Sequence, residues 1–149
     1  MQRKINIKMM DRILNSLNEN DNWITPPYVY DSLNEEFNFN FDPCPYRHCL
    51  DTWNGLEIEW GERNFVNPPY SKILKECFIH KAIEEKNKEK LCVMLLPVST
   101  STKIFHDFIL PNAKIIRFIR GRIKFEGNKF AGGTGKRDSM IVIFDGRIN

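Results

Sequence analysis

Two consecutive prolines end one short apolar segment of this chain and prevent it from continuing as a strand. Residues 64–66 favour an extended strand, and Asn67-Pro68-Pro69-Tyr70 follow them directly. Because proline locks φ and has no backbone N–H, a strand ladder cannot run through Pro68 and Pro69, and the chain must turn there. The turn gathers an amide side chain, a backbone carbonyl and an aromatic ring at the end of a strand.

This combination of groups suits an amino group attached to a flat ring. The side-chain oxygen of Asn67 and the carbonyl oxygen of Pro68 can each accept one hydrogen of an exocyclic NH2, while the ring of Tyr70 covers the flat face. The nitrogen lone pair would then be directed at an electrophile. A proline-rich turn closed by tyrosine, without any chemical role, is the alternative interpretation of the same residues.

Length and composition predict one small domain. The chain has 149 residues, of which 42% are hydrophobic, enough for one core and too few for two. We expect a polar arm or weak helix over residues 1–20 and a single domain over residues 21–149. No apolar run approaches the ~20 residues of a membrane span, and the N-terminus lacks an apolar signal segment. We therefore expect a cytoplasmic protein without a membrane partner.

The net charge of +3 conceals an uneven distribution along the chain. Residues 112–137 contain eight lysines and arginines against one acid, Glu126, which gives this segment a charge of +7 and leaves −4 on the remainder. A basic sector on an acidic body is typical of proteins that bind a polyanion. An ordinary solvated face is the alternative.

The hydrophobic pattern alternates between strands and helices. Thr25 can cap a helix whose first turn holds a proline and whose buried face carries Val29, Leu33 and Phe37. A continuous apolar run over residues 91–96 indicates a parallel strand that is buried on both faces. The other expected elements are strands at 39–41, 65–66, 114–125 and 139–144, a helix from about 72 to 88 on an apolar face of Ile73, Leu74, Cys77, Phe78 and Ala82, and a helix from a cap at 99–102 to Pro111. This order predicts an α/β fold with a mostly parallel sheet and a terminal antiparallel strand.

Two short polar motifs directly follow predicted strands. Asp42-Pro43-Cys44 follows the first strand, as residues 67–70 follow the second. Ligands of open α/β sheets bind beyond the carboxyl ends of strands, so both motifs are expected in one cleft. A carboxylate at Asp42 can accept hydrogen bonds from a ribose or an amino group; a simple turn before proline is the alternative.

Further residues are candidates for contacts with a ligand. Trp23, Thr25 and Pro26 either contact a cofactor or merely fasten the following helix to the core. Arg120, Arg122 and Lys124 alternate with less polar residues, so that three cations share one face of the predicted strand. Such an arrangement suits contacts with the phosphates of a nucleic acid.

The cysteines and histidines do not predict a metal site. Cys44, His48 and Cys49, together with Cys77 and His80 on a helix, match no common zinc spacing. We therefore expect no metal.

Several motifs in order resemble the small phage-type DNA adenine N6-methyltransferases, over about residues 23–144. They are Trp23-Ile24-Thr25-Pro26, the segment 39–45, the segment 65–71, Leu95-Leu96-Pro97, Phe105-His106 and the segment 121–125. The resemblance implies an abbreviated Rossmann-like methyltransferase fold, S-adenosylmethionine as cofactor and DNA as partner. It also implies that the target amino group is held by Asn67, Pro68 and Tyr70, within the motif that also contains Pro69, and that the base is flipped. The cofactor contacts are then expected at Trp23, Thr25, Pro26, Asp42, Pro43 and Cys44.

One departure from larger methyltransferases keeps alternatives open. No glycine-rich loop follows an N-terminal strand, so the part of the fold that binds the cofactor is short. The alternatives are a catalytically silent module that binds nucleic acid and an enzyme that acts on RNA. The three cations at Arg120, Arg122 and Lys124 argue against an acceptor such as protein glutamine.

Overall fold

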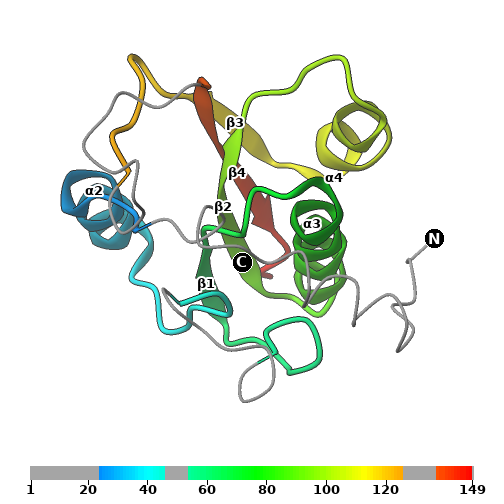
Figure 1. Ribbon diagram of the computed structural model, residues 1–149. Helices are drawn as coiled ribbons and strands as arrows, with labels where there is room; N and C mark the ends of the chain where they lie inside the picture. Colours follow the sequence, from blue (N-terminus) through cyan, green and yellow to red (C-terminus); the bar gives the residue numbers. More distant parts are fainter. Residues whose placement is uncertain (1–23, 46–53, 126–136, 149) are drawn as a thin grey trace.

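The computed structural model describes residues 24–45, 54–125 and 137–148. The predicted arm at 1–20 and Trp23 lie outside these residues. Figure 1 shows the elements in chain order. They are α2 (Pro27–Phe37), β1 (Arg63–Val66), α3 (Lys72–Lys86), β2 (Leu91–Pro97), a π-helical turn η2 (Phe105–Ile109), the short helix α4 (Leu110–Asn112), β3 (Ile115–Phe118) and β4 (Ser139–Asp145).

The four strands form a mixed sheet in the order β1-β2-β4-β3. β1 and β2 are parallel, with Val66 opposite Met94, whereas β4 is antiparallel to both β2 and β3. The prediction of an antiparallel last strand is confirmed, but this strand lies inside the sheet, so the pairing is mixed rather than mostly parallel. The predicted strand at 39–41 is reduced to a parallel bridge between Phe41 and Asn64 beside β1.

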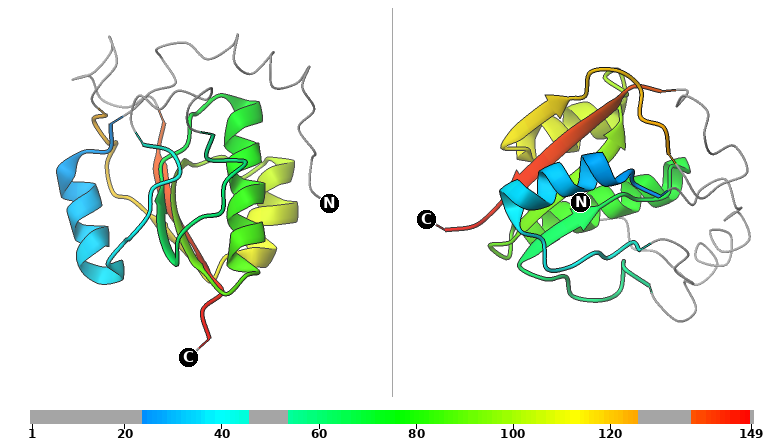
Figure 2. Two further views of the ribbon diagram at one scale, coloured as in Figure 1. Left: turned by 90° about the horizontal axis from the view of Figure 1, so that it is seen from below. Right: turned by 90° about the vertical axis from the view of Figure 1, so that its left-hand side faces the viewer.

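Helices cover both faces of the sheet. Figure 2 shows α2 on one face and α3 with α4 on the other, with the strands between them. The side chains of successive β2 residues point to opposite faces of the sheet. Leu91, Val93 and Leu95 pack in the cluster that contains residues of α2, and the residues between them pack in the cluster that contains residues of α3. β2 is therefore buried throughout, as its continuous apolar run predicts.

Helix α2 begins one residue later than the predicted cap requires. Its N-cap is Pro26, and the carbonyl oxygen of Pro26 accepts the N–H groups of Val29 and Tyr30. The prediction that Thr25 caps this helix is wrong, because the hydroxyl of Thr25 is used elsewhere. The predicted buried face is confirmed at Val29 and Leu33.

Helix α3 buries the predicted face except at its first turn. Leu74, Cys77, Phe78 and Ala82 are buried, whereas Ile73 is 43% exposed. Ile73 lies about 100° around the helix from the buried Leu74, which places it outside the buried face. The next predicted helix also forms: Thr102 Oγ1 accepts the N–H of Phe105, and the helix continues past Pro111 to Asn112.

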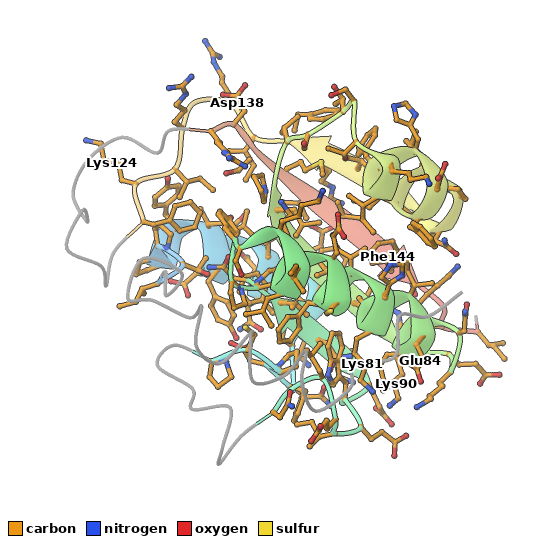
Figure 3. The ribbon with its side chains drawn as sticks, turned by 45° about the vertical axis from the view of Figure 1, so that its right-hand side comes forward. Lys81, Glu84, Lys90, Lys124, Asp138 and Phe144 are labelled. Carbon is orange, nitrogen blue, oxygen red and sulfur yellow. The ribbon has the colours of Figure 1, made fainter. Side chains whose placement is uncertain are left out.

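The strand predicted at 114–125 is shorter in the structure. β3 ends at Phe118, and Gly121 has φ +77°, a left-handed conformation that interrupts a strand. Beyond it Ile123 and Phe125 are buried on the α2 side. The predicted alternation is right although the strand is not, and Figure 3 shows Lys124 projecting outward.

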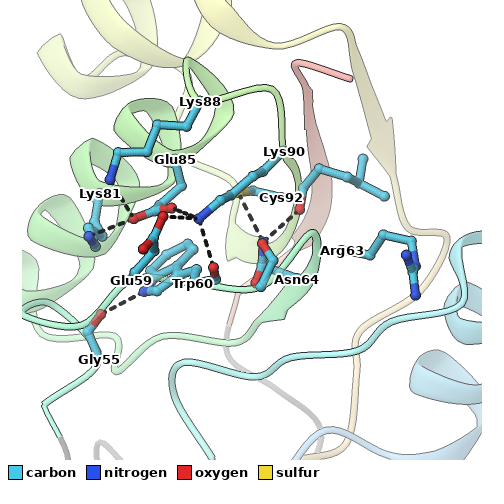
Figure 4. Close-up of polar contacts among 12 residues, drawn as sticks. Gly55, Glu59, Trp60, Arg63, Asn64, Lys81, Glu85, Lys88, Lys90 and Cys92 are labelled. Carbon is cyan, nitrogen blue, oxygen red and sulfur yellow. Dashed lines mark hydrogen bonds and ion pairs between the residues drawn. The ribbon is translucent and has the colours of Figure 1, made fainter. Parts of the chain in front are cut away.

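A buried ionic cluster lies at the amino ends of β1 and β2. The side chain of Glu85 is 0% exposed and accepts hydrogen bonds from Lys81 Nζ at 2.7 Å and Lys90 Nζ at 2.6 Å. Lys90 also donates to the carbonyl oxygen of Trp60 at 2.7 Å, and Lys88 Nζ lies 3.4 Å from Glu85 (Figure 4). The cluster thus fastens the end of α3 to the segments that enter both parallel strands.

Candidate active site

The motif at residues 67–70 lies where the sequence predicts it, at the carboxyl end of β1. Pro68 and Pro69 are buried, while Asn67 and Tyr70 are half-buried. β1 ends opposite Met94, and β2 continues to Pro97. The motif therefore occupies the edge of the sheet at which open α/β folds bind their ligands.

The amide of Asn67 is fixed by a residue far away in sequence. Its Nδ2 donates a hydrogen bond of 3.0 Å to Thr25 Oγ1. This contact turns the nitrogen end of the amide toward Thr25, so that Oδ1 forms the other end. A predicted catalytic residue and a predicted cofactor residue are thus joined directly.

A pocket of about 340 Å³, here named the α2 pocket, opens beside this contact. Three of the predicted cofactor residues line it, Thr25, Asp42 and Cys44, together with Asn67. Pro26 and Pro43 are buried but do not line it, and Trp23 lies outside the described residues. Two aromatic rings in its wall, Tyr30 and Phe65, are not predictable as site residues, because nothing in the local sequence distinguishes them from ordinary core residues.

Asp42 is the acidic group in this pocket whose ionisation is most perturbed. Its Oδ1 accepts the N–H of Cys44 at 2.8 Å, which favours the charged form. Burial among the pocket atoms outweighs that hydrogen bond and raises the pKa of Asp42 to about 6. The residue nevertheless has an exposed surface, which we attribute to the open side of the pocket. A carboxylate that is crowded by protein yet open on one side is suited to a polar ligand.

Tyr70, at the other end of the motif, is one of the residues that line a second cavity. This cavity, here named the α3 pocket, measures about 320 Å³ and is lined by residues of α3, the end of β2, the helix at 103–112 and the start of β4. The ring of Tyr70 meets Phe125 edge to face, with 5.8 Å between centroids. Among the described residues its buried hydroxyl has no hydrogen-bond partner, and burial raises the pKa of Tyr70. The motif therefore lies between two pockets, with Asn67 on one and Tyr70 on the other.

The three predicted phosphate contacts line neither pocket. Arg120, Arg122 and Lys124 are exposed on the segment that follows β3, and Arg122 Nε lies 3.5 Å from Asp138 Oδ1. The same segment places Phe125 against Tyr70. The cations consequently flank the candidate site without forming its walls.

Candidate metal ligands are not gathered in the part of the chain that the structure describes. Within residues 24–45, 54–125 and 137–148, no three His, Cys, Asp or Glu side chains are placed to hold an ion. His48 and Cys49 lie outside these residues.

Comparisons with known proteins relate the chain to one family by sequence. Residues 15–147 match the family described as DNA N-6-adenine-methyltransferase (Dam). The chain is 33% identical over 151 residues to a DNA N-6-adenine-methyltransferase of Haemophilus phage HP1 (strain HP1c1), covering 92% of this chain and 86% of that protein. A DNA N-6-adenine-methyltransferase of Escherichia phage T1 is 33% identical over 102 residues, which cover 60% of this chain and 39% of that protein.

The similarity to known proteins lies in sequence, since no solved structure matches the chain. Among the described helices, none has the length and apolar character that crossing a membrane requires. The family match over residues 15–147 and the similarity to the phage HP1 protein over most of both chains decide the assignment: the chain belongs to the DNA N-6-adenine-methyltransferase (Dam) family.

Proposed function

We propose that the protein transfers a methyl group from S-adenosylmethionine to the N6 amino group of adenine in DNA, with the base flipped out of the duplex to residues 67–70. The observation that supports this site best is the hydrogen bond from Asn67 Nδ2 to Thr25 Oγ1, which fixes the amide in the wall of the α2 pocket. A base must leave the stack to reach a recessed edge of a sheet, at a cost of a few kcal/mol.

The α2 pocket fits the cofactor by its chemistry. The carboxylate of Asp42 and the hydroxyl of Thr25 offer acceptors to the amino group and the ribose hydroxyls, and the walls are partly apolar. Thr25, Asp42 and Cys44 would hold the molecule, with Pro26 and Pro43 supporting the wall from the interior. S-adenosylmethionine supplies an electrophilic methyl group when it is bound.

The motif itself acts by orientation. Asn67 Oδ1 and the carbonyl oxygen of Pro68 accept the two N6 hydrogens, so the lone pair of the nitrogen is directed toward the α2 pocket. The ring of Tyr70 covers the adenine, and Pro69 holds the turn in place. Placing reactants in this way can lower a barrier by several kcal/mol. The methyl–sulfur bond of the donor would break as the nitrogen–methyl bond forms, and the methylated nitrogen would lose one proton to water, so no general base is required.

This assignment makes the fold an abbreviated Rossmann-like methyltransferase. The bridge at Phe41, β1 and β2 point their carboxyl ends at one edge, with helices on both faces. Asp42 follows that bridge and Asn67 follows β1. Since the matched relatives come from phages, we also propose that the enzyme is encoded by a phage or virus and acts in the cytoplasm of the infected cell.

The decisive test is Asn67→Ala. We expect methyl transfer to adenine to fall by about 100-fold or more, the size of effect seen when one acceptor or donor at a reacting group is removed. Labelled cofactor, DNA and digestion to nucleosides measure the product, and RNA of the same sequence tests the acceptor. Asn87→Ala, which removes an exposed amide at the end of α3, is the matched control.

Two outcomes would contradict the proposal. N6-methyladenine formed equally by wild type and Asn67→Ala would remove residues 67–70 from the reaction. DNA binding without any methylated product would favour the silent module, which the family assignment does not favour.

A further inference from the structure

The α3 pocket carries charge that the proposed reaction does not yet use. Three cations line it, Lys72 and Lys75 from the first turn of α3 and Arg137 from the segment that leads into β4. The same wall contains one carboxylate, Glu76. Lys75 and Arg137 are far apart in sequence, so only the fold brings these charges together.

These cations are not neutralised by the described part of the protein. None of the three has a carboxylate within 4.0 Å among the described residues, unlike Lys81, Lys88 and Lys90, which all meet Glu85. Burial lowers the pKa of Lys75, and the neighbouring charges of Arg137 and Lys72 lower it further, while Glu76 acts in the opposite direction. Like charges gathered at a half-buried position are stabilised by an anion.

Tyr70 belongs to the wall of this pocket as well. Its ring packs against the cluster on the α2 side, and its buried hydroxyl has no hydrogen-bond partner in the described ranges. A buried donor without a partner destabilises the protein, and a ligand that supplies the partner removes this cost. Thr102 Oγ1, by contrast, already donates to the carbonyl oxygen of Ser99 at 2.8 Å.

We propose that Lys72, Lys75 and Arg137 bind a phosphate of the DNA strand beside the flipped adenine, at the mouth of the α3 pocket. This inference rests on the proposed function. A base that is stacked against Tyr70 brings its sugar and its flanking phosphates to the same side of the motif. Charged donors on a phosphodiester fix the position of a strand without reading its sequence. The residues are distinct from Arg120, Arg122 and Lys124, which lie outside this pocket.

The experiment pairs a protein variant with a change to one phosphate. The probe is a duplex that the wild-type protein methylates at one mapped adenine, prepared with a neutral methylphosphonate at each phosphate around that adenine in turn. We expect one such duplex to lose about tenfold in affinity for the wild type, near the value of one charge-assisted hydrogen bond. Lys75→Gln should lose about the same on unmodified DNA and nothing further on that duplex.

Controls separate a local contact from general charge and from folding. Lys103→Gln, an exposed cation on the neighbouring helix, should keep the sensitivity of the wild type to that methylphosphonate. Lys72→Gln and Arg137→Gln, both at exposed positions, give the same test if Lys75→Gln does not fold. Calorimetry should show unchanged binding of S-adenosylmethionine in all variants.

The failures of the two proposals are distinguishable. If the loss in DNA affinity caused by Lys75→Gln multiplies with the loss caused by every methylphosphonate, this inference is overturned. Loss of methylation in Asn67→Ala would still support the proposed function. Inorganic phosphate that binds the wild type but not Lys75→Gln, with no sensitive phosphate in the duplex, would assign the pocket to a small anion instead.

Discussion

Two carboxylates at opposite ends of the sheet are held in opposite ways. Glu85, at the amino end, is fully buried and surrounded by lysines whose side chains reach it from α3 and from the residue before β2. Asp42, at the carboxyl end, lines an open pocket, and the hydrogen bond that the described structure gives its carboxylate comes from the N–H of Cys44. One end of the sheet is saturated with partners, and the other presents groups to a ligand.

The pKa values of the two groups record this difference. Burial raises the pKa of Glu85, but hydrogen bonds from Lys81 and Lys90 outweigh burial and hold the pKa below its ordinary value. Burial also raises the pKa of Asp42, to about 6, because among the described residues it is opposed by the hydrogen bond from the Cys44 N–H and not by a cation. The same cause therefore has opposite outcomes, because Lys81 and Lys90 contact Glu85, whereas no cation among the described residues contributes to the pKa of Asp42.

The contrast separates stability from function. A paired and buried charge stabilises the native state only while its partners remain, whereas a crowded charge without a cation costs stability and gains affinity for a ligand. Substitutions at the amino end should thus change stability, and those at the carboxyl end should change binding.

The largest effect is expected from Glu85→Gln. Removing the charge leaves Lys81 and Lys90, which are 11% and 13% exposed, without their counter-charge. Breaking a buried ion pair in this way costs roughly 3–5 kcal/mol. Urea unfolding measures the loss, with the exposed Glu35→Gln on α2 as control, expected within about 0.5 kcal/mol of the wild type. Unchanged stability of Glu85→Gln would show that the cluster does not hold this end of the sheet.

The sequence predicts the elements near the site better than it predicts the amino-end cluster. The prolines at 68 and 69 end β1 whatever else surrounds them, and the apolar run at 91–96 requires a strand that is buried on both faces. Both signals are local. In the sequence, Glu85 cannot be distinguished from an exposed residue of α3. Its burial depends on the contact with Lys90, and the fold determines where Lys90 lies relative to the helix.

Pairing and pockets escape local patterns for the same reason. Insertion of β4 between β2 and β3 depends on contacts between distant segments, and the conformation at Gly121 ends a strand that alternation alone would extend to Phe125. Thr25 is a good helix cap by composition, yet its hydroxyl lies against Asn67. The motifs were therefore predictable, whereas the partners of their side chains were not.

A smaller effect, and one of opposite sign on stability, is expected from Asp42→Asn. The folded pKa of about 6 lies above the ordinary value, so the folded state binds this proton more tightly than the unfolded chain does. The stabilisation is full below the pKa of the unfolded chain and is lost as pH rises through about 6. At pH above 6, where Asp42 is ionised, Asp42→Asn should therefore be slightly more stable than the wild type, as urea unfolding at pH 7 would measure.

Binding of the cofactor should follow the same titration in reverse. If the carboxylate is the form that accepts hydrogen bonds, the affinity for S-adenosylmethionine is constant above pH 6 and falls by up to about tenfold for each pH unit below it. Asp42→Asn should bind more weakly and lose this dependence, whereas the exposed Asp107→Asn should retain it. Calorimetry at pH values on both sides of the pKa checks both, and identical profiles for Asp42→Asn and the wild type would contradict the role of Asp42.

The smallest expected effect per residue concerns the exposed cations Arg120, Arg122 and Lys124, which flank the candidate site. Arg120, Arg122 and Lys124 are exposed and line neither pocket, and Arg122 already has Asp138 at 3.5 Å, so each can contribute only salt-screened attraction to DNA. Replacing all three with Gln should flatten the slope of log affinity against log salt by roughly 0.9 for each phosphate that the variant no longer neutralises, with little change in the preferred sequence. Exchanging the two arginines for lysine keeps the charge and should keep the slope. This control distinguishes the effect of charge from the effect of the shape of the arginine side chain. An unchanged slope in the Gln variant would show that these cations are only the solvated edge of the segment after β3 and that the DNA-facing surface lies elsewhere.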